Sequence, residues 1–126
     1  MESLAPKARY MTEMSVSKSK FIAILEPLNS QEEYIAVIEK IKAEFPKAKH
    51  YCYAMRYEGY AKYSDDKEPH GTAGRPILLS LERKSIDKAI IVVVRYFGGT
   101  KLGAGNLLRT YVKSSTSVVD KFLNEL

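Results

Sequence analysis

A run from Ala89 to Phe97, AIIVVVRYF, which is continuously apolar from Ala89 to Val94, most constrains how this chain can fold. The run is rich in β-branched residues and does not alternate between apolar and polar positions, as expected of a strand buried on both faces. Its apolar part is far too short to cross a bilayer, which takes about 20 apolar residues. The run therefore predicts an interior strand of a sheet.

Three further segments have the two-residue period of β-strands. They are Val16–Leu28, His50–Tyr57 and, after a turn at Gly59, the short segment Tyr60–Ser64. The alternation in the second segment places Tyr51, Tyr53, Met55 and Tyr57 on one face, and His50, Cys52, Ala54 and Arg56 on the other. Tyrosines on an open face can stack nucleobases, or they can pack against a helix or a partner protein. We expect packing for most of them.

Helical patterns separate these strands. Ser30 and Glu33 have the spacing of a capping box, and the helix that they open would end at Pro46. Its apolar stripe is Tyr34, Val37, Ile38, Ile41 and Phe45. A second helix is predicted to begin between Thr72 and Pro76 and to reach about Lys84. The chain would finish with a long amphipathic helix whose inner face is Leu108, Tyr111, Val112, Ser115, Val119 and Phe122.

The order of these elements predicts an α+β fold. We expect a two-layer α/β sandwich, with a mostly antiparallel four-stranded sheet and helices on one of its faces. Residues 1–14 have no clear period and are predicted to be a tail or an irregular segment. A length of 126 residues is most simply one domain, residues 1–126, large enough for its own core.

Composition narrows the class of protein. Hydrophobic residues make up 45% and charged residues 28%, as is typical of soluble globular proteins. No apolar signal segment follows the N-terminus, and a single cysteine, Cys52, excludes an internal disulfide. Both features favour a cytoplasmic location without a membrane partner. The net charge is +5, and the stretch from Lys88 to Val119 has five basic and no acidic residues, which favours polyanions or phosphates.

Two glycine segments, each before a predicted helix, are candidates for anion binding. A helix start presents free amides and a partial positive charge, so a phosphate can bind there if no side chain blocks it. In FGGTKLGAGN, the glycines are Gly98, Gly99, Gly103 and Gly105, with the cations Lys101 and Arg109 close by. The spacing matches neither a Walker loop nor a dinucleotide fingerprint. A tight strand-to-helix turn, for which glycines supply positive φ, is the alternative.

The other segment, YSDDKEPHGTAGRP, adds the carboxylates Asp65, Asp66 and Glu68. They could hold Mg²⁺, with His70 extending the set toward a transition metal. They could instead cap a helix. We expect no metal and no cofactor, and predict that Asp65 or Asp66 accepts hydrogen bonds at the helix start or pairs with Arg95 or Arg109. His50 and Cys52 share a strand face, but Cys52 is more consistent with a core residue than with a nucleophile.

The two motifs, YSDDKEPHGTAGRPIL and VVVRYFGGTKLGAGNLLRTY, together with HYCYAMR, resemble the YigZ/IMPACT family from about Lys18 to Val119. The first signature is Ser64, Asp65, Asp66, Glu68, Pro69, Gly71, Thr72, Ala73 and Gly74. The second is Arg95, Tyr96, Phe97, Gly98, Gly99, Lys101, Leu102, Gly103, Gly105 and Arg109. Lys67 and Asn106 stand where the family usually has glycine; asparagine tolerates the left-handed conformations that such a loop requires.

The resemblance implies the fold of the second domain of a small-subunit ribosomal protein. It also implies a role around translation. Eukaryotic relatives regulate the amino-acid-starvation kinase pathway, and bacterial relatives are suspected of binding nucleic acid. Bacterial members usually carry a second, ferredoxin-like domain, so the resemblance implies a minimal member or a truncated chain.

We therefore expect a non-enzymatic domain that binds RNA or a ribosome-associated partner through its two glycine signatures. The residues expected to bind phosphate are Arg95, Lys101, Arg109, Gly98, Gly99, Gly103, Gly105, Thr72 and Gly74. One alternative is a nucleotide-dependent phosphotransferase that uses Asp65 or Asp66 with Mg²⁺. The other is a protein-binding module that competes for a partner in translation control.

Overall fold

The computed structural model describes residues 3–126, which form a five-stranded antiparallel sheet and three helices. The elements are β1 (Tyr10–Val16), β2 (Ser19–Pro27), α1 (Glu33–Glu44), β3 (His50–Tyr57), β4 (Tyr60–Ser64), α2 (Gly74–Arg83), β5 (Ala89–Tyr96) and α3 (Ala104–Asn124). The strand order is β1-β2-β5-β3-β4, and every neighbouring pair is antiparallel. The prediction of an α+β fold is confirmed.

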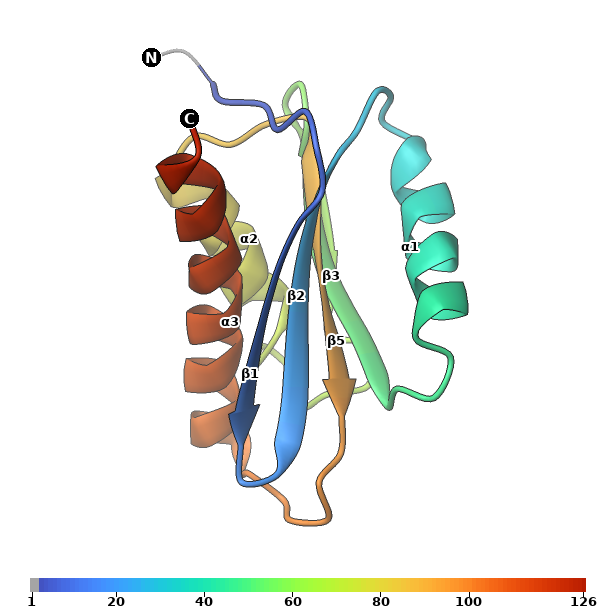
Figure 1. The fold of residues 1–126 in the computed structure, drawn as a ribbon, viewed down its shortest axis with the longest axis vertical. Coiled ribbons are helices and arrows are strands. Elements are labelled where there is room, and N and C mark those ends of the chain that lie inside the picture. Colours follow the sequence, from blue (N-terminus) through green and yellow to red (C-terminus); the bar gives the residue numbers. More distant parts are fainter. Residues whose placement is uncertain (1–2) are drawn as a thin grey trace.

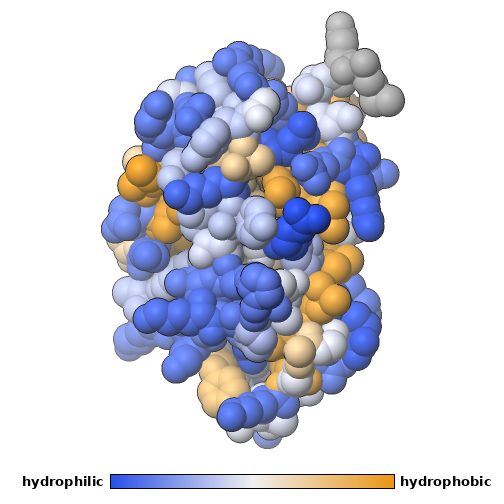
Figure 2. Space-filling view, turned by 180° about the vertical axis from the view of Figure 1, so that it is seen from behind, coloured by the Kyte–Doolittle hydropathy of each residue, from blue (hydrophilic) through white to orange (hydrophobic). Residues whose placement is uncertain are grey.

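The central strand β5 is buried on both faces because helices cover both sides of the sheet. Figure 1 shows α2 and α3 on one side and α1 on the other. Ile91 and Val93 belong to the core under α2 and α3, whereas Ile90, Val92 and Val94 belong to the core under α1. Seen from behind, the surface is mostly hydrophilic, with separate hydrophobic patches (Figure 2).

Two details of the predicted sandwich are corrected. The sheet has a fifth strand, and the helices do not all lie on one face (Figure 1). The stripe of α1, with Val37 and Ile41 buried, packs in the same core as Ile24 and Val92. Both faces of the central strands are apolar, so each face needs a cover that removes it from water.

The additional strand is β1, which lies in the segment predicted to be irregular. It pairs with β2 across a two-residue hairpin turn in which Ser17 and Lys18 have φ of 46° and 69°. Positive φ at both turn residues matches the right-handed twist of the strands. The Tyr10 ring packs 5.4 Å from that of Phe122 in α3, which holds the strand against the helix. Of the predicted tail, residues 1 and 2 lie outside the described range.

The remaining elements follow the sequence closely, with two corrections. The predicted capping box of Ser30 and Glu33 does not form. No side chain caps α1, and Glu33 accepts a hydrogen bond from the Asn29 amide instead (2.9 Å). In α3, Leu108 and Val112 are 42% and 37% exposed. The buried face of that helix is rotated and consists of Leu107, Thr110, Tyr111, Ser114, Ser115, Val118, Val119 and Phe122. Among the described residues, no helix has the length and apolar character needed to span a membrane.

Candidate functional site

A buried ion pair joins the two signature motifs. The Arg95 guanidinium at the end of β5 donates from Nη1 to both carboxylate oxygens of Glu68, at 2.7 and 2.9 Å. The two side chains are 5% and 3% exposed. The Tyr111 hydroxyl of α3 donates to the same carboxylate at 2.5 Å. Glu68 therefore ties the loop before α2 to both β5 and α3, and Arg95 pairs with Glu68 rather than with Asp65 or Asp66.

Asp65 caps the start of α2, as one of the two predicted arrangements requires. Its carboxylate accepts hydrogen bonds from the amides of Gly71 (2.8 Å), Ala73 (3.1 Å) and Gly74 (2.8 Å). Burial alone would raise the pKa of this carboxyl, but these three amides and His70 act in the other direction and the pKa lies below its ordinary value. The partial positive charge at the start of α2 is therefore satisfied by the chain itself.

The other residues of the first signature are also used within the fold. Asp66 accepts a hydrogen bond from the Tyr51 amide at 2.7 Å, and the Thr72 hydroxyl donates to the Pro69 carbonyl at 2.6 Å. A Cβ atom on Gly74 would lie 2.8 Å from the Tyr63 ring. Ser64 accepts from the Asp66 amide at 3.0 Å. Within residues 3–126, no group of three or more His, Cys, Asp or Glu side chains is arranged to hold a metal ion.

The start of α3 has no such cap. Its N-cap is Gly103, with φ of 78°, no side chain bonds to the first-turn amides, and the first turn has no acidic residue. Arg109 donates to the Asn106 side chain at 2.6 Å, and its guanidinium lies 3.6–4.0 Å from the position of a Cβ on Gly105. A cation is thus held over a helix start that is itself partially positive, an arrangement that an anion would stabilise.

The glycines of the second signature have different roles. A Cβ on Gly98 would lie 2.2 Å from the backbone of Lys18 in the β1–β2 turn, and Gly99 has φ of 91°, so the fold itself requires both glycines. Gly103 is likewise required by its φ. Gly105 is different, because a Cβ there would meet only the Arg109 guanidinium at ordinary contact distance. A glycine within a helix lowers stability by about 0.5–1 kcal/mol relative to alanine, and packing does not require a glycine at position 105.

A cavity of about 430 Å³ opens beside this helix start, and both signatures line it. Glu68 and Pro69 come from the first signature, and Arg95, Phe97, Lys101, Leu102 and Gly103 from the second. Lys49, His50, Ala104 and Leu107 complete the wall. Sequence reasoning missed Lys49, His50 and Leu107. Lys49 and His50 reach the cavity because His50 pairs with Arg95 across β3 and β5, and no local sequence pattern contains that register.

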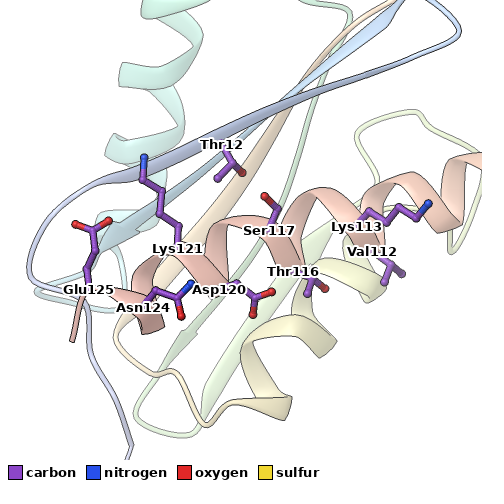
Figure 3. Close-up of a pocket in the computed structure, with 9 residues that line it drawn as sticks. All are labelled: Thr12, Val112, Lys113, Thr116, Ser117, Asp120, Lys121, Asn124 and Glu125. Atoms are coloured by element: carbon purple, nitrogen blue, oxygen red, sulfur yellow. The ribbon is translucent and has the colours of Figure 1, made fainter.

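A larger groove of about 670 Å³ runs along α3 and contains no signature residue. Figure 3 shows that its side chains come from α3 and from Glu125 directly after it, except for Thr12 of β1. Lys121 in this groove donates to the Met11 carbonyl at 3.0 Å and so links the helix to the strand. This groove is therefore separate from the cavity that the two signatures share.

Cys52 packs in the interior as expected, and the tyrosines of β3 are partly buried against the core under α1. Cys52 is fully buried, its thiol donates to the Asp65 carbonyl at 3.1 Å, and burial raises its pKa well above the ordinary value. The nearby His50 ring nitrogen Nδ1 lies 2.7 Å from the Asp66 carbonyl oxygen. On the other face, the Tyr51 hydroxyl donates to the Phe45 carbonyl, and Tyr53 packs 5.9 Å from Tyr34 of α1.

Comparison with known proteins places this arrangement in a family. The Impact N-terminal domain matches residues 17–119. An IMPACT family member of Haemophilus influenzae is 40% identical over 115 residues, covering 87% of this chain and 56% of the relative. The IMPACT family member YigZ of Escherichia coli is 38% identical over 117 residues, covering 88% and 57%. The chain thus spans little more than half the length of these relatives.

Solved structures share the fold. The crystal structure of a hypothetical protein matches with a TM-score of 0.89 and 34% identity, covering 93% of this chain and 59% of that one. The two-domain translational regulator Yih1 matches with a TM-score of 0.57 and 20% identity, covering 95% and 49%. The second match shows the fold alone. Because the Impact N-terminal domain matches residues 17–119, which are most of this chain, the chain belongs to the IMPACT family.

Proposed function

We propose that this chain is a translation-associated domain that binds RNA at the start of α3, without catalysing a reaction. The observation that carries the proposal is the contrast between the two helix starts. The start of α2 is filled by the Asp65 carboxylate. The start of α3 has neither a side-chain cap nor an acidic residue in its first turn. An RNA phosphate is an anion of the kind that such a start binds.

The charges around α3 support a polyanion rather than a single small anion. Lys49 and Lys101 are exposed on the wall of the cavity, and Arg109 lies beside the first turn. Arg95 has a different role, because its guanidinium is committed to Glu68. It positions the loop, while the exposed cations contact phosphates. Such contacts supply most of the affinity of sequence-independent nucleic-acid binding.

Family membership supports the connection to translation. The structural neighbour Yih1 is described as a translational regulator, and a ribosome-associated factor or a protein partner in translation control is the corresponding class of partner for this chain. A role in translation would place it in the cytoplasm. A magnesium-dependent phosphotransferase is less consistent with the site, because Asp65 and Asp66 both accept hydrogen bonds from backbone amides.

Fluorescence anisotropy with a labelled single-stranded RNA, measured over a salt series, tests the proposal. Affinity should fall steeply as salt rises, because each phosphate contact releases counterions. Lys101→Ala and Arg109→Ala should each lower the slope of log K against log salt by about 0.7. Lys113→Ala removes the same charge from an exposed site farther along α3 and should leave the slope unchanged. Absence of RNA binding at low salt would contradict the proposal.

A further inference from the structure

The cavity beside α3 has two chemically different walls. Phe97, Leu102 and Leu107 form an apolar part, while Lys49 and Lys101 bring positive charge. Its volume of about 430 Å³ lies within the range of about 300–1,000 Å³ typical of small-molecule pockets. Phosphate contacts alone need a charged surface but no apolar hollow. Binding of the RNA sugar-phosphate backbone therefore does not explain the apolar part of the cavity.

Phe97 is placed as a stacking platform. Phe97 is 50% exposed, and the Arg95 guanidinium lies 5.9 Å from the centroid of its ring. The ion pair with Glu68 fixes that guanidinium, so the ring rests on a rigid support. Exposed aromatic rings supported in this way are what proteins use to stack the unpaired bases of single-stranded nucleic acid.

A polar group in the cavity wall is left without a partner. Arg95 is 4% exposed and lines the cavity, and its Nε is buried without a hydrogen bond within the described chain. Buried polar atoms of this kind are rare and call for an explanation. Arg95 is thus a residue of the cavity wall with a donor that the described chain leaves unsatisfied.

We infer that the cavity takes one unstacked nucleotide of single-stranded RNA. The base lies against Phe97 and the apolar wall formed by Leu102 and Leu107, and its phosphate lies at the start of α3 beside Lys101. This inference rests on the proposed function and adds to it a ligand unit, a base together with a phosphate. It also predicts a preference for single strands, because a paired base within a duplex cannot enter the cavity.

The experiment compares three RNA probes of equal length by anisotropy at one salt concentration: a single strand, its duplex, and an abasic ribose-phosphate strand. The single strand should bind about fivefold or more tightly than the abasic strand, as expected from stacking of one base. Phe97→Ala should remove that advantage and leave affinity for the abasic strand unchanged. Leu108→Ala, at an exposed leucine of α3 outside the cavity, is the matched control and should keep the advantage.

The outcomes separate the inference from the proposed function. Equal affinity for the single and abasic strands, with no effect of Phe97→Ala, would overturn the nucleotide site while RNA binding through phosphates stands. Absence of binding to all three probes would overturn both.

Discussion

The Glu68 carboxylate and the Arg95 guanidinium, 27 positions apart in the sequence, form a buried ion pair with an N–O distance of 2.7 Å. One residue lies in the loop before α2 and the other in the central strand β5. The Tyr111 hydroxyl of α3 binds the same carboxylate. The pair therefore fixes the loop, the sheet and the helix whose start forms the candidate site.

A double-mutant cycle tests how strongly this pair couples the two motifs. Glu68→Gln should lower the free energy of unfolding by about 3 kcal/mol or more, because it leaves the buried Arg95 charge without its counter-ion. Arg95→Met alone should have a comparable effect, whereas Glu68→Gln with Arg95→Met should cost less than the sum. Urea unfolding of the four proteins measures the coupling. Strictly additive effects would mean that the pair does not act as a unit.

Asp65→Asn tests the cap on α2. Asparagine is itself a good capping residue but lacks the charge and one of the two acceptor oxygens, so the three amides cannot all be satisfied. We expect a loss of about 1 kcal/mol in the free energy of unfolding, measured by thermal or urea melts. Asp120→Asn, at an exposed carboxylate of α3, is the control and should have little effect.

The same melts, repeated with EDTA and with Mg²⁺, separate a cap from a metal ligand. The cap requires no ion, so wild-type stability should not respond to either addition. Wild-type protein that loses stability in EDTA, together with an Asp65→Asn variant that does not respond, would show that the carboxylates hold an ion.

The pH dependence of stability follows from the lowered pKa of Asp65. The amides stabilise the charged carboxylate in the folded protein, so protons bind more tightly to the unfolded chain. The contribution is fully present above the ordinary value of 3.8 and is lost as the pH falls through the lower pKa of the folded state. The difference in stability between wild type and Asp65→Asn should therefore be constant from about pH 5 to 8 and shrink below about pH 4. A difference that grows in acid would contradict this assignment.

The sequence predicted the elements whose patterns are local. The alternation in His50–Tyr57, the apolar run of β5 and the start of α2 each depend on neighbouring residues, and the structure confirms them. Asp65 as a helix cap was also predictable, because a carboxylate before a helix start commonly has that role. In contrast, the strand β1 alternates between exposed and half-buried residues, a pattern too weak to distinguish it from an irregular segment.

The candidate site depends on contacts that no local pattern contains. The partner of Arg95 is Glu68 because β3, and with it β4 and the loop that carries Glu68, lies beside β5, and this arrangement depends on the strand order. The apolar stripe of α1 likewise does not show on which face of the sheet the helix packs. The unalternating run of β5 did indicate that both faces of the sheet are covered, since a strand that is apolar on both faces requires a layer on each side. The cavity and its lysine, Lys49, follow only when these elements are assembled.

The most direct measurement of the central claim, that the start of α3 is a binding surface, is the paired stability and RNA affinity of Gly105→Ala. The methyl group meets only the Arg109 guanidinium, so the variant should be more stable by about 0.5–1 kcal/mol. Side-chain carbons of a helix lean toward its N-terminus, where the methyl group would obstruct a phosphate.

Affinity for single-stranded RNA should therefore fall by about tenfold, the equivalent of a weakened hydrogen bond to a charged group. Thr116→Ala, an exposed position farther along α3, should leave RNA affinity unchanged. A more stable Gly105→Ala protein that binds RNA less tightly would support the account. A protein that binds RNA as tightly as the wild type would contradict it.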